Sequence, residues 1–231
     1  MSEYADEKLR IEFPTHKVFD LIYENKWKQV KRAIFFNKSI ATKCTGCCKS
    51  KCNARHSVLH YMCQFRPPLD VVKTLFKAYP NAVFEKDCKE RHALHIACKH
   101  GCAPEVIKYL LEKNPEAASK ADIKRRTPLL LACKNFVFES RMSWDIANNM
   151  LAEVARALTI AAPFVITDED YKELTALEYA IENALVGACC IMQHAVTEYQ
   201  HDSDRQRLEN MKLEYIARHG FITIPYTIKI A

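Results

Sequence analysis

Glycine is scarce in this sequence, and the motifs of several common protein classes are missing from it. Only 4 of the 231 residues are glycine. No glycine-rich phosphate loop, Gly-x-Ser-x-Gly or His-Glu-x2-His motif occurs, which argues against nucleotide-binding and common hydrolytic sites. No run approaches 18 uninterrupted apolar residues, and no apolar segment follows the acidic residues 1–7. We therefore expect a non-catalytic protein without a membrane partner, working in the cytoplasm or the nucleus.

Cysteine, in contrast, is abundant. The 11 cysteines are expected to be reduced thiols, because disulfides are rare in proteins that lack an export signal. A cysteine–histidine catalytic pair is not indicated, since 11 cysteines and 9 histidines allow such pairs by chance. The hydrophobic content of 49% is enough to bury one continuous core, and we expect a single elongated domain.

Four stretches of the sequence share one pattern and recur at long intervals. Their leading leucines are separated by 35, 35 and 48 residues; they are Leu59, Leu94, Leu129 and Leu177. Further apolar residues stand 12 and 16 positions after Leu59 and Leu94 and indicate a second helix in each unit. Pro80 and Pro115 then end that helix. A period in this range is typical of stacked supersecondary units.

The units led by Leu94 and Leu129 resemble ankyrin repeats. The resemblance rests on Asp87, the run 92–98, Gly101 and the run 105–111, and on the Thr-Pro-Leu motif of residues 127–129. It implies an all-α, ankyrin-like α-solenoid of about five helix-turn-helix repeats. It also implies protein binding, without a cofactor, on a concave surface of hairpin tips and first-helix side chains.

The repeat frame divides the chain into three parts. We expect an N-terminal extension at 1–14, repeats at about 15–51, 52–86, 87–121, 122–169 and 170–197, and a C-terminal segment at 198–231 with a capping helix and an apolar tail. An insertion falls at about 44–52. Thirteen further residues, placed at about 136–148, are expected between the two helices of the fourth repeat.

The hairpin tips depart from the family pattern. Ankyrin repeats usually carry glycine there, because the tip needs a positive φ. This sequence has other residues at the four tips, namely Arg55, Glu90, Arg125 and Lys172. The sequence therefore predicts tips that are looser or differently turned.

Positive charge gathers where these tips are expected, in a chain of net charge +6. Candidate partner-binding residues on the tips and just inside them are Lys51, His56, Lys89, Arg91, Lys99, His100, Lys124, Arg125, Arg126 and Lys134. Stacked repeats would align them into a row that favours an acidic protein partner. Nucleic-acid binding through the same row is an alternative, and so is an ordinary solvated face, since Glu85 and Glu90 interrupt the row.

The insertion at about 44–52 carries a second candidate site. Cys44 and Cys47 have the spacing of a metal knuckle, and Cys52 and His56 would complete four zinc ligands. Zinc- or redox-linked regulation is therefore an alternative function. The other interpretation is a solvated basic loop with incidental cysteines.

Other recurring residues are assigned structural roles. Cys63, Cys98 and Cys133 occupy one repeat position and are expected to be small buried hydrophobes. His60 and His95 are expected to hydrogen-bond within or between hairpins. The stretch 136–144, which ends at Trp144, has three aromatic residues that either cover the core or form a partner-binding pocket. The sequence thus predicts a non-catalytic protein–protein interaction module or adaptor.

Overall fold

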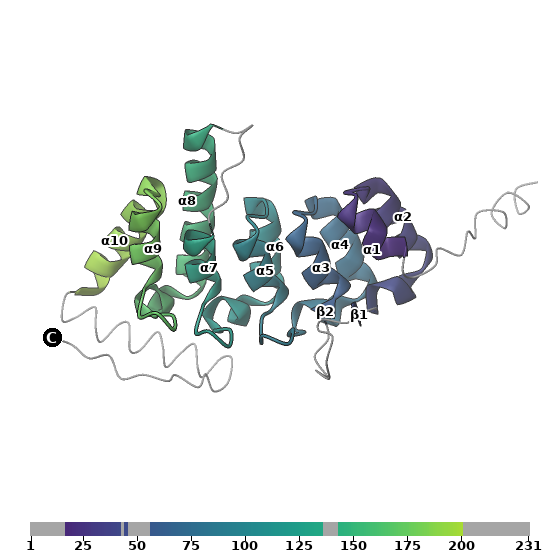
Figure 1. Cartoon of the computed structure of the whole chain (residues 1–231), viewed down its shortest axis with the longest axis horizontal. Coiled ribbons are helices and arrows are strands. Elements are labelled where there is room, and N and C mark those ends of the chain that lie inside the picture. Colours follow the sequence, from purple (N-terminus) through teal and green to yellow (C-terminus); the bar gives the residue numbers. More distant parts are fainter. Residues whose placement is uncertain (1–16, 43, 46–55, 136–142, 201–231) are drawn as a thin grey trace, which may run out of the picture.

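The predicted all-α repeat fold is confirmed by a computed structural model, which describes residues 17–42, 44–45, 56–135 and 143–200. Helix pairs stand side by side in a row along the long axis of the molecule (Figure 1). The first, inner helices are α1 (Lys17–Tyr23), α3 (Val58–Gln64), α5 (Ala93–Lys99), α7 (Pro128–Lys134) and α9 (Ala176–Glu182). The second, outer helices are α2 (Trp27–Phe36), α4 (Leu69–Ala78), α6 (Pro104–Lys113), α8 (Trp144–Ala161) and α10 (Val186–Gln200).

Short elements connect these pairs. The outer helices α4, α6 and α8 end two residues before a proline, as the sequence predicts for the first two. Each proline opens a 3-10 turn, and these turns are η3 (Pro80–Val83), η4 (Pro115–Ser119) and η5 (Pro163–Thr167). A further 3-10 turn, η2 (Lys38–Thr42), follows α2 and begins without a proline. Strands β1 (Cys44–Thr45) and β2 (His56–Ser57) pair antiparallel and close the insertion before the second repeat.

The inner helices α3, α5 and α7 are short and nearly wholly buried, because each is packed between two inner neighbours and the outer layer. In α5, all residues from Ala93 to Cys98 are buried, and only Lys99 at the end of the helix is partly exposed. Capping fixes where these helices begin: the Thr127 hydroxyl accepts a hydrogen bond from the Leu130 N–H, and Thr175 with Glu178 forms the predicted type of capping box.

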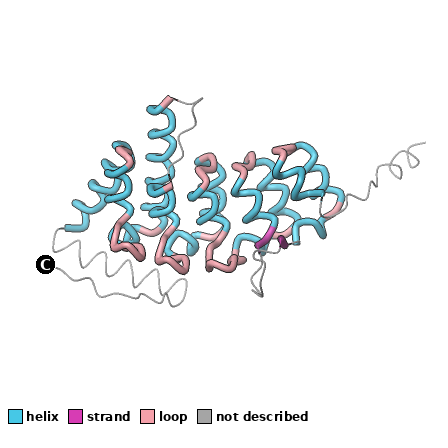
Figure 2. Tube along the Cα trace, viewed as in Figure 1, coloured by secondary structure: helices cyan, strands magenta, loops and turns pink. Residues whose placement is uncertain are grey.

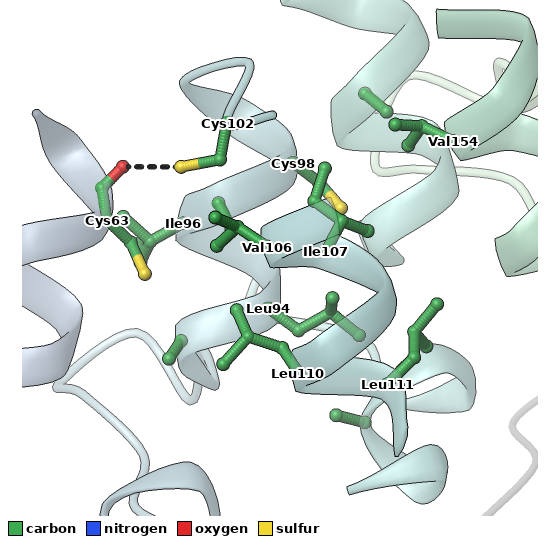
Figure 3. Close-up of a cluster of buried hydrophobic side chains, with 14 of the residues drawn as sticks. Cys63, Leu94, Ile96, Cys98, Cys102, Val106, Ile107, Leu110, Leu111 and Val154 are labelled. Carbon is green, nitrogen blue, oxygen red and sulfur yellow. Dashed lines mark hydrogen bonds between the residues drawn. The ribbon is translucent and has the colours of Figure 1, made fainter. Parts of the chain in front are cut away.

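One apolar core runs through the described part of the stack, and cysteines contribute to it. Cys63, Cys98 and Cys133 are at most 3% exposed, which confirms their prediction as buried hydrophobes. Burial raises the pKa of the Cys98 thiol and raises that of Cys133 to about 12. Figure 3 shows how the sulfur of Cys102 joins two repeats by a hydrogen bond to the Cys63 carbonyl oxygen, at 3.3 Å.

Non-glycine residues take left-handed backbone conformations at the hairpin tips. At the hairpin tips, Glu90, Arg125 and Glu173 have φ of 58°, 59° and 62°. The tips therefore keep the turn that glycine usually makes, and the prediction of a differently turned tip is wrong for these three. The assignment of Lys172 to a tip is also wrong by one residue, because Glu173 takes the positive φ.

The fourth repeat differs from its neighbours in the length of its outer helix. Helix α8 has 18 residues, whereas α4 and α6 have 10 each, and it rises above them (Figure 1). The prediction that residues 136–148 all lie between the helices is therefore wrong for 144–148, which belong to α8. The sequence shift alone does not distinguish a longer loop from a longer helix.

The contact between α8 and α10 depends on one glycine. A Cβ atom at Gly187 would lie 2.9 Å from the Cβ of Ala152, closer than real Cβ contacts allow. Ala152 has no flexible side chain that could move aside, so the two helices would have to separate. We expect Gly187→Ala to lower the free energy of unfolding by about 1–2 kcal/mol, as overpacked contacts do. Urea unfolding would measure it, with Cys190→Ala on the exposed side of α10 as control; unchanged stability would contradict such a tight contact.

Candidate partner-binding surface

The turns before α5, α7 and α9 project from the lower end of the stack (Figure 2). We call these turns the fingers and number them after their repeats: the third finger comprises residues 87–92, the fourth comprises residues 122–127, and the fifth comprises residues 170–175. Each begins with a buried aspartate whose backbone N–H bonds across the turn; in the third repeat, the Asp87 N–H donates to the Arg91 carbonyl at 3.0 Å. One carboxylate oxygen of Asp87 accepts from the N–H groups of Lys89 and Arg91, at 2.8 and 3.0 Å. This aspartate therefore holds the finger from inside.

In the third and fourth fingers, the negative charge of the buried aspartate is balanced by an arginine of the same finger. The Arg91 guanidinium donates to Asp87 at 2.8 and 2.5 Å. Arg126 binds Asp122 in the same bidentate way. Burial alone would raise the pKa of both carboxyls, but the hydrogen bonds and charge of the arginines outweigh it and leave each pKa below its ordinary value.

The fifth finger uses a cation from the preceding repeat. Leu174 stands where the other fingers have arginine, and the ammonium group of Lys134, at the end of α7, donates to Asp170 at 2.8 Å. The Tyr179 hydroxyl also donates to Asp170, at 3.0 Å, and the Tyr179 ring centre lies 4.3 Å from the Lys134 nitrogen. Asp170 is fully buried. This contact therefore ties the fourth and fifth repeats together.

Backbone hydrogen bonds join the fingers to one another. The N–H of Ile123 donates to the Lys89 carbonyl at 3.1 Å, and the N–H of Tyr171 donates to the Lys124 carbonyl at 3.2 Å. The same position of each finger thus bonds to the preceding finger. This arrangement fixes the spacing of their side chains and preorganises them for binding.

The predicted basic row divides into exposed and internal members. Lys89 and Lys124 are exposed on the fingers, Arg125 is half-buried at a tip, and Lys99 and His100 are half-buried where α5 ends. Arg91 is only 8% exposed. Arg91, Arg126 and Lys134 instead hold the finger aspartates. Arg126 is half-buried, because the turn folds its side chain back onto Asp122.

Lys99 lies at the centre of the positive cluster. Burial lowers the pKa of Lys99, and the positive charges around it lower it further. Those charges are on Arg91, Lys89 and Arg126, with Asp87 opposing them. The pKa of His100 falls to about 4, first through burial and then through Lys99 and two arginines. Lys99 therefore lies among cationic groups of the third and fourth repeats, two of which, Arg91 and Arg126, are paired with buried aspartates.

Sequence reasoning missed the aromatic residues on this side of the stack. The Tyr171 ring lies 5.0 Å from the Lys124 nitrogen and 5.4 Å from that of Lys134. A second group contains Phe19 and Tyr23 on α1, Tyr61 on α3, and Phe65 directly after α3. Their repeat positions give a signal that was available in the sequence, since Phe65 and His100 both stand six residues after a leading leucine.

Comparison with protein families decides the identity of these repeats. Residues 48–141 match the family model for ankyrin repeats, in three copies. Residues 48–141 are ankyrin repeats. No curated protein matches the chain. Ankyrin repeats are protein-interaction modules, and the matched part of the chain includes the third and fourth fingers with the cluster around Lys99.

The two histidines of the ankyrin motif have hydrogen bonds that explain them. His60 is fully buried, with one ring nitrogen 2.8 Å from the Ser57 hydroxyl and the other 2.9 Å from the Arg91 carbonyl oxygen. The Nδ1 atom of His95 accepts from the His92 N–H, so its Nε2–H donates to the Lys120 carbonyl at 2.9 Å. Both side chains connect the ankyrin repeats structurally, as the sequence predicts.

Several predicted site residues lie away from the fingers or outside the described residues. Trp144 is 41% exposed at the start of α8. The side chains of Lys51, His56, Cys44, Cys47 and Cys52 are not among those that the structure describes, so the zinc site stays a prediction. Among the described side chains, no group of three or more His, Cys, Asp or Glu residues is arranged to hold a metal ion.

A cavity lies between the third and fourth repeats. An apolar cavity of about 220 Å³ lies where α5 ends and α6 begins, and Cys102, Ile107 and Leu151 are among its lining residues. None of the helices in the described ranges has the length and apolar character needed to cross a membrane.

Proposed function

We propose that the protein is a non-catalytic adaptor that binds an acidic segment of another protein along the fingers and the ends of the inner helices. The observation that carries this proposal is the set of lysines on one face of the third and fourth repeats, with Lys89 and Lys124 exposed on hydrogen-bonded fingers and Lys99 at the end of α5. Two arginines near Lys99 are neutralised by their finger aspartates, but no described carboxylate forms an ion pair with Lys89, Lys99 or Lys124. An acidic partner would supply the missing negative charge and would raise the lowered pKa of Lys99.

The rigidity of the surface supports the same proposal. The finger row is fixed by backbone hydrogen bonds, so binding needs little ordering of the protein. Glu90 and Glu173 are exposed at the tips, whereas the lysines lie beside them. The favoured contact for an acidic segment therefore runs between the tips and the inner-helix ends rather than over the tips themselves.

A charge-reversal experiment tests this proposal. The probe is a fluorescent, extended peptide of about 12 residues containing Asp and Glu, long enough to cross four repeats spaced by roughly 8–10 Å. We expect the triple change Lys89→Glu, Lys99→Glu and Lys124→Glu to weaken its binding at least about tenfold. The matched control reverses three exposed charges on outer helices, Lys28→Glu, Lys77→Glu and Arg156→Glu, which alters net charge equally.

Two results would count against an acidic protein partner on this surface. The first is equal weakening by the finger triple and the outer-helix triple, which would show that only net charge matters. The second is tighter binding of a nucleic-acid duplex than of the peptide, with affinity falling steeply as salt is raised. Urea unfolding of each variant would establish that the ankyrin fold is retained.

A further inference from the structure

Four aromatic rings form a continuous cluster on the inner helices of the first two repeats. The ring centres of Phe19 and Tyr61 are 5.3 Å apart, those of Tyr61 and Phe65 are 5.1 Å apart, and those of Tyr23 and Phe65 are 5.7 Å apart. Tyr23 is 67% exposed. Phe19, Tyr61 and Phe65 are partly buried and pack against the core. The cluster thus has a rigid base and an open apolar surface, the character of a binding hot spot.

This cluster adjoins the basic cluster around Lys99. Phe65 is followed by Arg66, whose Nε–H donates to the His100 carbonyl at 2.7 Å. Along the ends of the inner helices, the residue five positions after the leading apolar residue is Tyr23 in the first repeat and Lys99 in the third. The ends of the inner helices therefore change from aromatic in the first repeat to cationic in the third.

Acidic residues at the aromatic end give the surface a polarity. Asp20 is exposed on α1 and lies near enough to Tyr61 to raise its pKa, after the larger effect of burial. Glu24 pairs with Lys26 at 2.7 Å, so this end has no comparable excess of positive charge. Acidic side chains of a partner would be repelled at Asp20 and attracted at Lys99.

The distance between the two clusters sets the spacing in the partner. The aromatic cluster lies at the first two repeats and the basic cluster at the third and fourth, which separates their centres by two repeats. Neighbouring helices are roughly 8–10 Å apart, and an extended chain covers about 3.3 Å per residue. About five or six residues of partner chain therefore separate the two contacts.

We propose that the partner is a hydrophobic–acidic segment, in which a large apolar side chain packs on the Tyr23–Phe65 cluster and acidic residues, about five or six positions away, pair with the cluster around Lys99. This inference rests on the proposed function and narrows it. The aromatic cluster supplies apolar contact area, and the cationic cluster fixes the direction in which the segment lies.

Synthetic peptides and one exposed tyrosine test the inference. The first peptide has a Leu-Phe pair, a Gly/Ser spacer of about five residues and a Glu block, and it is made in both orders. In the second, serines replace Leu-Phe. We expect the first, in one of its two orders, to bind at least about tenfold tighter than the second. Tyr23→Ala should remove this advantage and leave binding of the second peptide unchanged. The control is Phe35→Ala, which removes an aromatic ring that is 72% exposed on the outer helix α2.

The outcomes separate this inference from the function on which it rests. If both peptides bind equally in both orders, the aromatic contact is wrong while acidic-segment binding stands. If neither peptide binds, both proposals fail. If a Leu-Phe peptide without glutamates binds as tightly as the first, or if Phe35→Ala matches Tyr23→Ala, the joint hydrophobic–acidic recognition is wrong. Removing the spacer should reduce the tenfold advantage, and an unchanged advantage would contradict the inferred spacing.

Discussion

Lowering the pH from 7 to 5 is expected to reduce the free energy of unfolding by about 4 kcal/mol through two buried histidines. His95 is fully buried with a pKa of about 3, and His92 is 6% exposed with a pKa of about 4. Burial is the main cause of both values, and the neighbouring charges of Lys86 and Lys120 also lower the pKa of His92. The Nδ1 atom of His92 lacks a hydrogen-bond partner among the described residues.

Stability falls with falling pH because the pKa values of His92 and His95 are lower in the folded protein than in the unfolded chain. An unfolded-state histidine has a pKa of about 6.5, so below that pH the unfolded chain takes up protons that folded His92 and His95 do not. Their stabilising contribution is therefore complete above about pH 6.5 and is lost as the pH falls toward the folded-state pKa values. At pH 5 each histidine accounts for about 2 kcal/mol, since one pH unit corresponds to about 1.4 kcal/mol.

His95→Gln gives this prediction a specific test. At pH 7 the variant should lose about 1 kcal/mol, because the bonds to His92 and Lys120 are weakened. It should also lose the pH dependence that His95 contributes, so that at pH 5 it equals or exceeds the original protein in stability. Urea midpoints at pH 7, 6 and 5 would show the crossing.

The matched control is Ile107→Val, which costs about 1 kcal/mol in the core without adding or removing a titrating group. Its stability should run parallel to that of the original protein across the whole pH range. If His95→Gln also runs parallel, then His95 is not the source of the acid sensitivity.

Lys134→Met is expected to lower the free energy of unfolding by about 2–3 kcal/mol. The change leaves the carboxylate of Asp170, whose side chain is 0% exposed, without its cation. Removing one partner of a buried ion pair costs more than an exposed pair contributes, because the remaining charge stays desolvated. The N–H of Lys172 and the hydroxyl of Tyr179 still bond to Asp170, which places the expected loss at the lower end of the range for such pairs.

Two further variants make this result specific. Lys124→Met removes an exposed lysine of the adjacent finger and should change stability by less than about 0.5 kcal/mol. Adding Asp170→Asn to Lys134→Met should recover part of the loss, since the unpaired charge is then gone. Equal losses in Lys124→Met and Lys134→Met, measured by urea unfolding, would contradict a role for the buried pair.

The contribution of Asp170 also has its own pH range. Burial raises the pKa of this carboxyl, but hydrogen bonds from Lys134, Lys172 and Tyr179 outweigh burial and lower it. The stabilisation is therefore present above the unfolded-state value of about 3.9 and is lost as the pH falls through the folded-state pKa. Between pH 7 and 5, where the histidine effect is measured, the contribution of Asp170 is therefore unchanged and does not affect the comparison.

The repeat frame was accessible from the sequence because it depends on spacing. Leucines at intervals of 35 residues, prolines after the outer helices and aspartates before the inner ones each have a local physical reason, and the structure places them accordingly. The direction in which an arginine side chain points has no such local signal in the sequence. Arg126 follows Asp122 by four residues in a turn, and only the fold of that turn decides whether its guanidinium points outward or back onto the carboxylate.

Contacts between repeats were harder still to predict. Lys134 and Asp170 are 36 residues apart, and their pairing depends on the leucine at position 174, which leaves the fifth finger without its own arginine. The aromatic cluster was obscured because Tyr23 and Phe65 lie on either side of the insertion at about 44–52. Extra residues in the fourth repeat were assigned to a loop, since an offset in spacing is the same whether a loop or a helix has grown.

The aspartate of the fifth finger is paired with a lysine of the fourth repeat, and this pairing limits how the repeats can be rearranged. Repeat proteins gain and lose units by duplication and deletion, and a unit that balances its own charges can be transplanted with little penalty. The third and fourth fingers meet that condition, because Asp87 and Asp122 each have an arginine four residues away. The fifth does not, because Asp170 takes its cation from Lys134 at the end of the preceding inner helix. Helix α5 ends in a lysine at the same repeat position, whereas α3 ends in Gln64. The fifth repeat can therefore follow a unit whose inner helix ends in lysine, but a unit such as the second repeat would leave Asp170 buried without a cation.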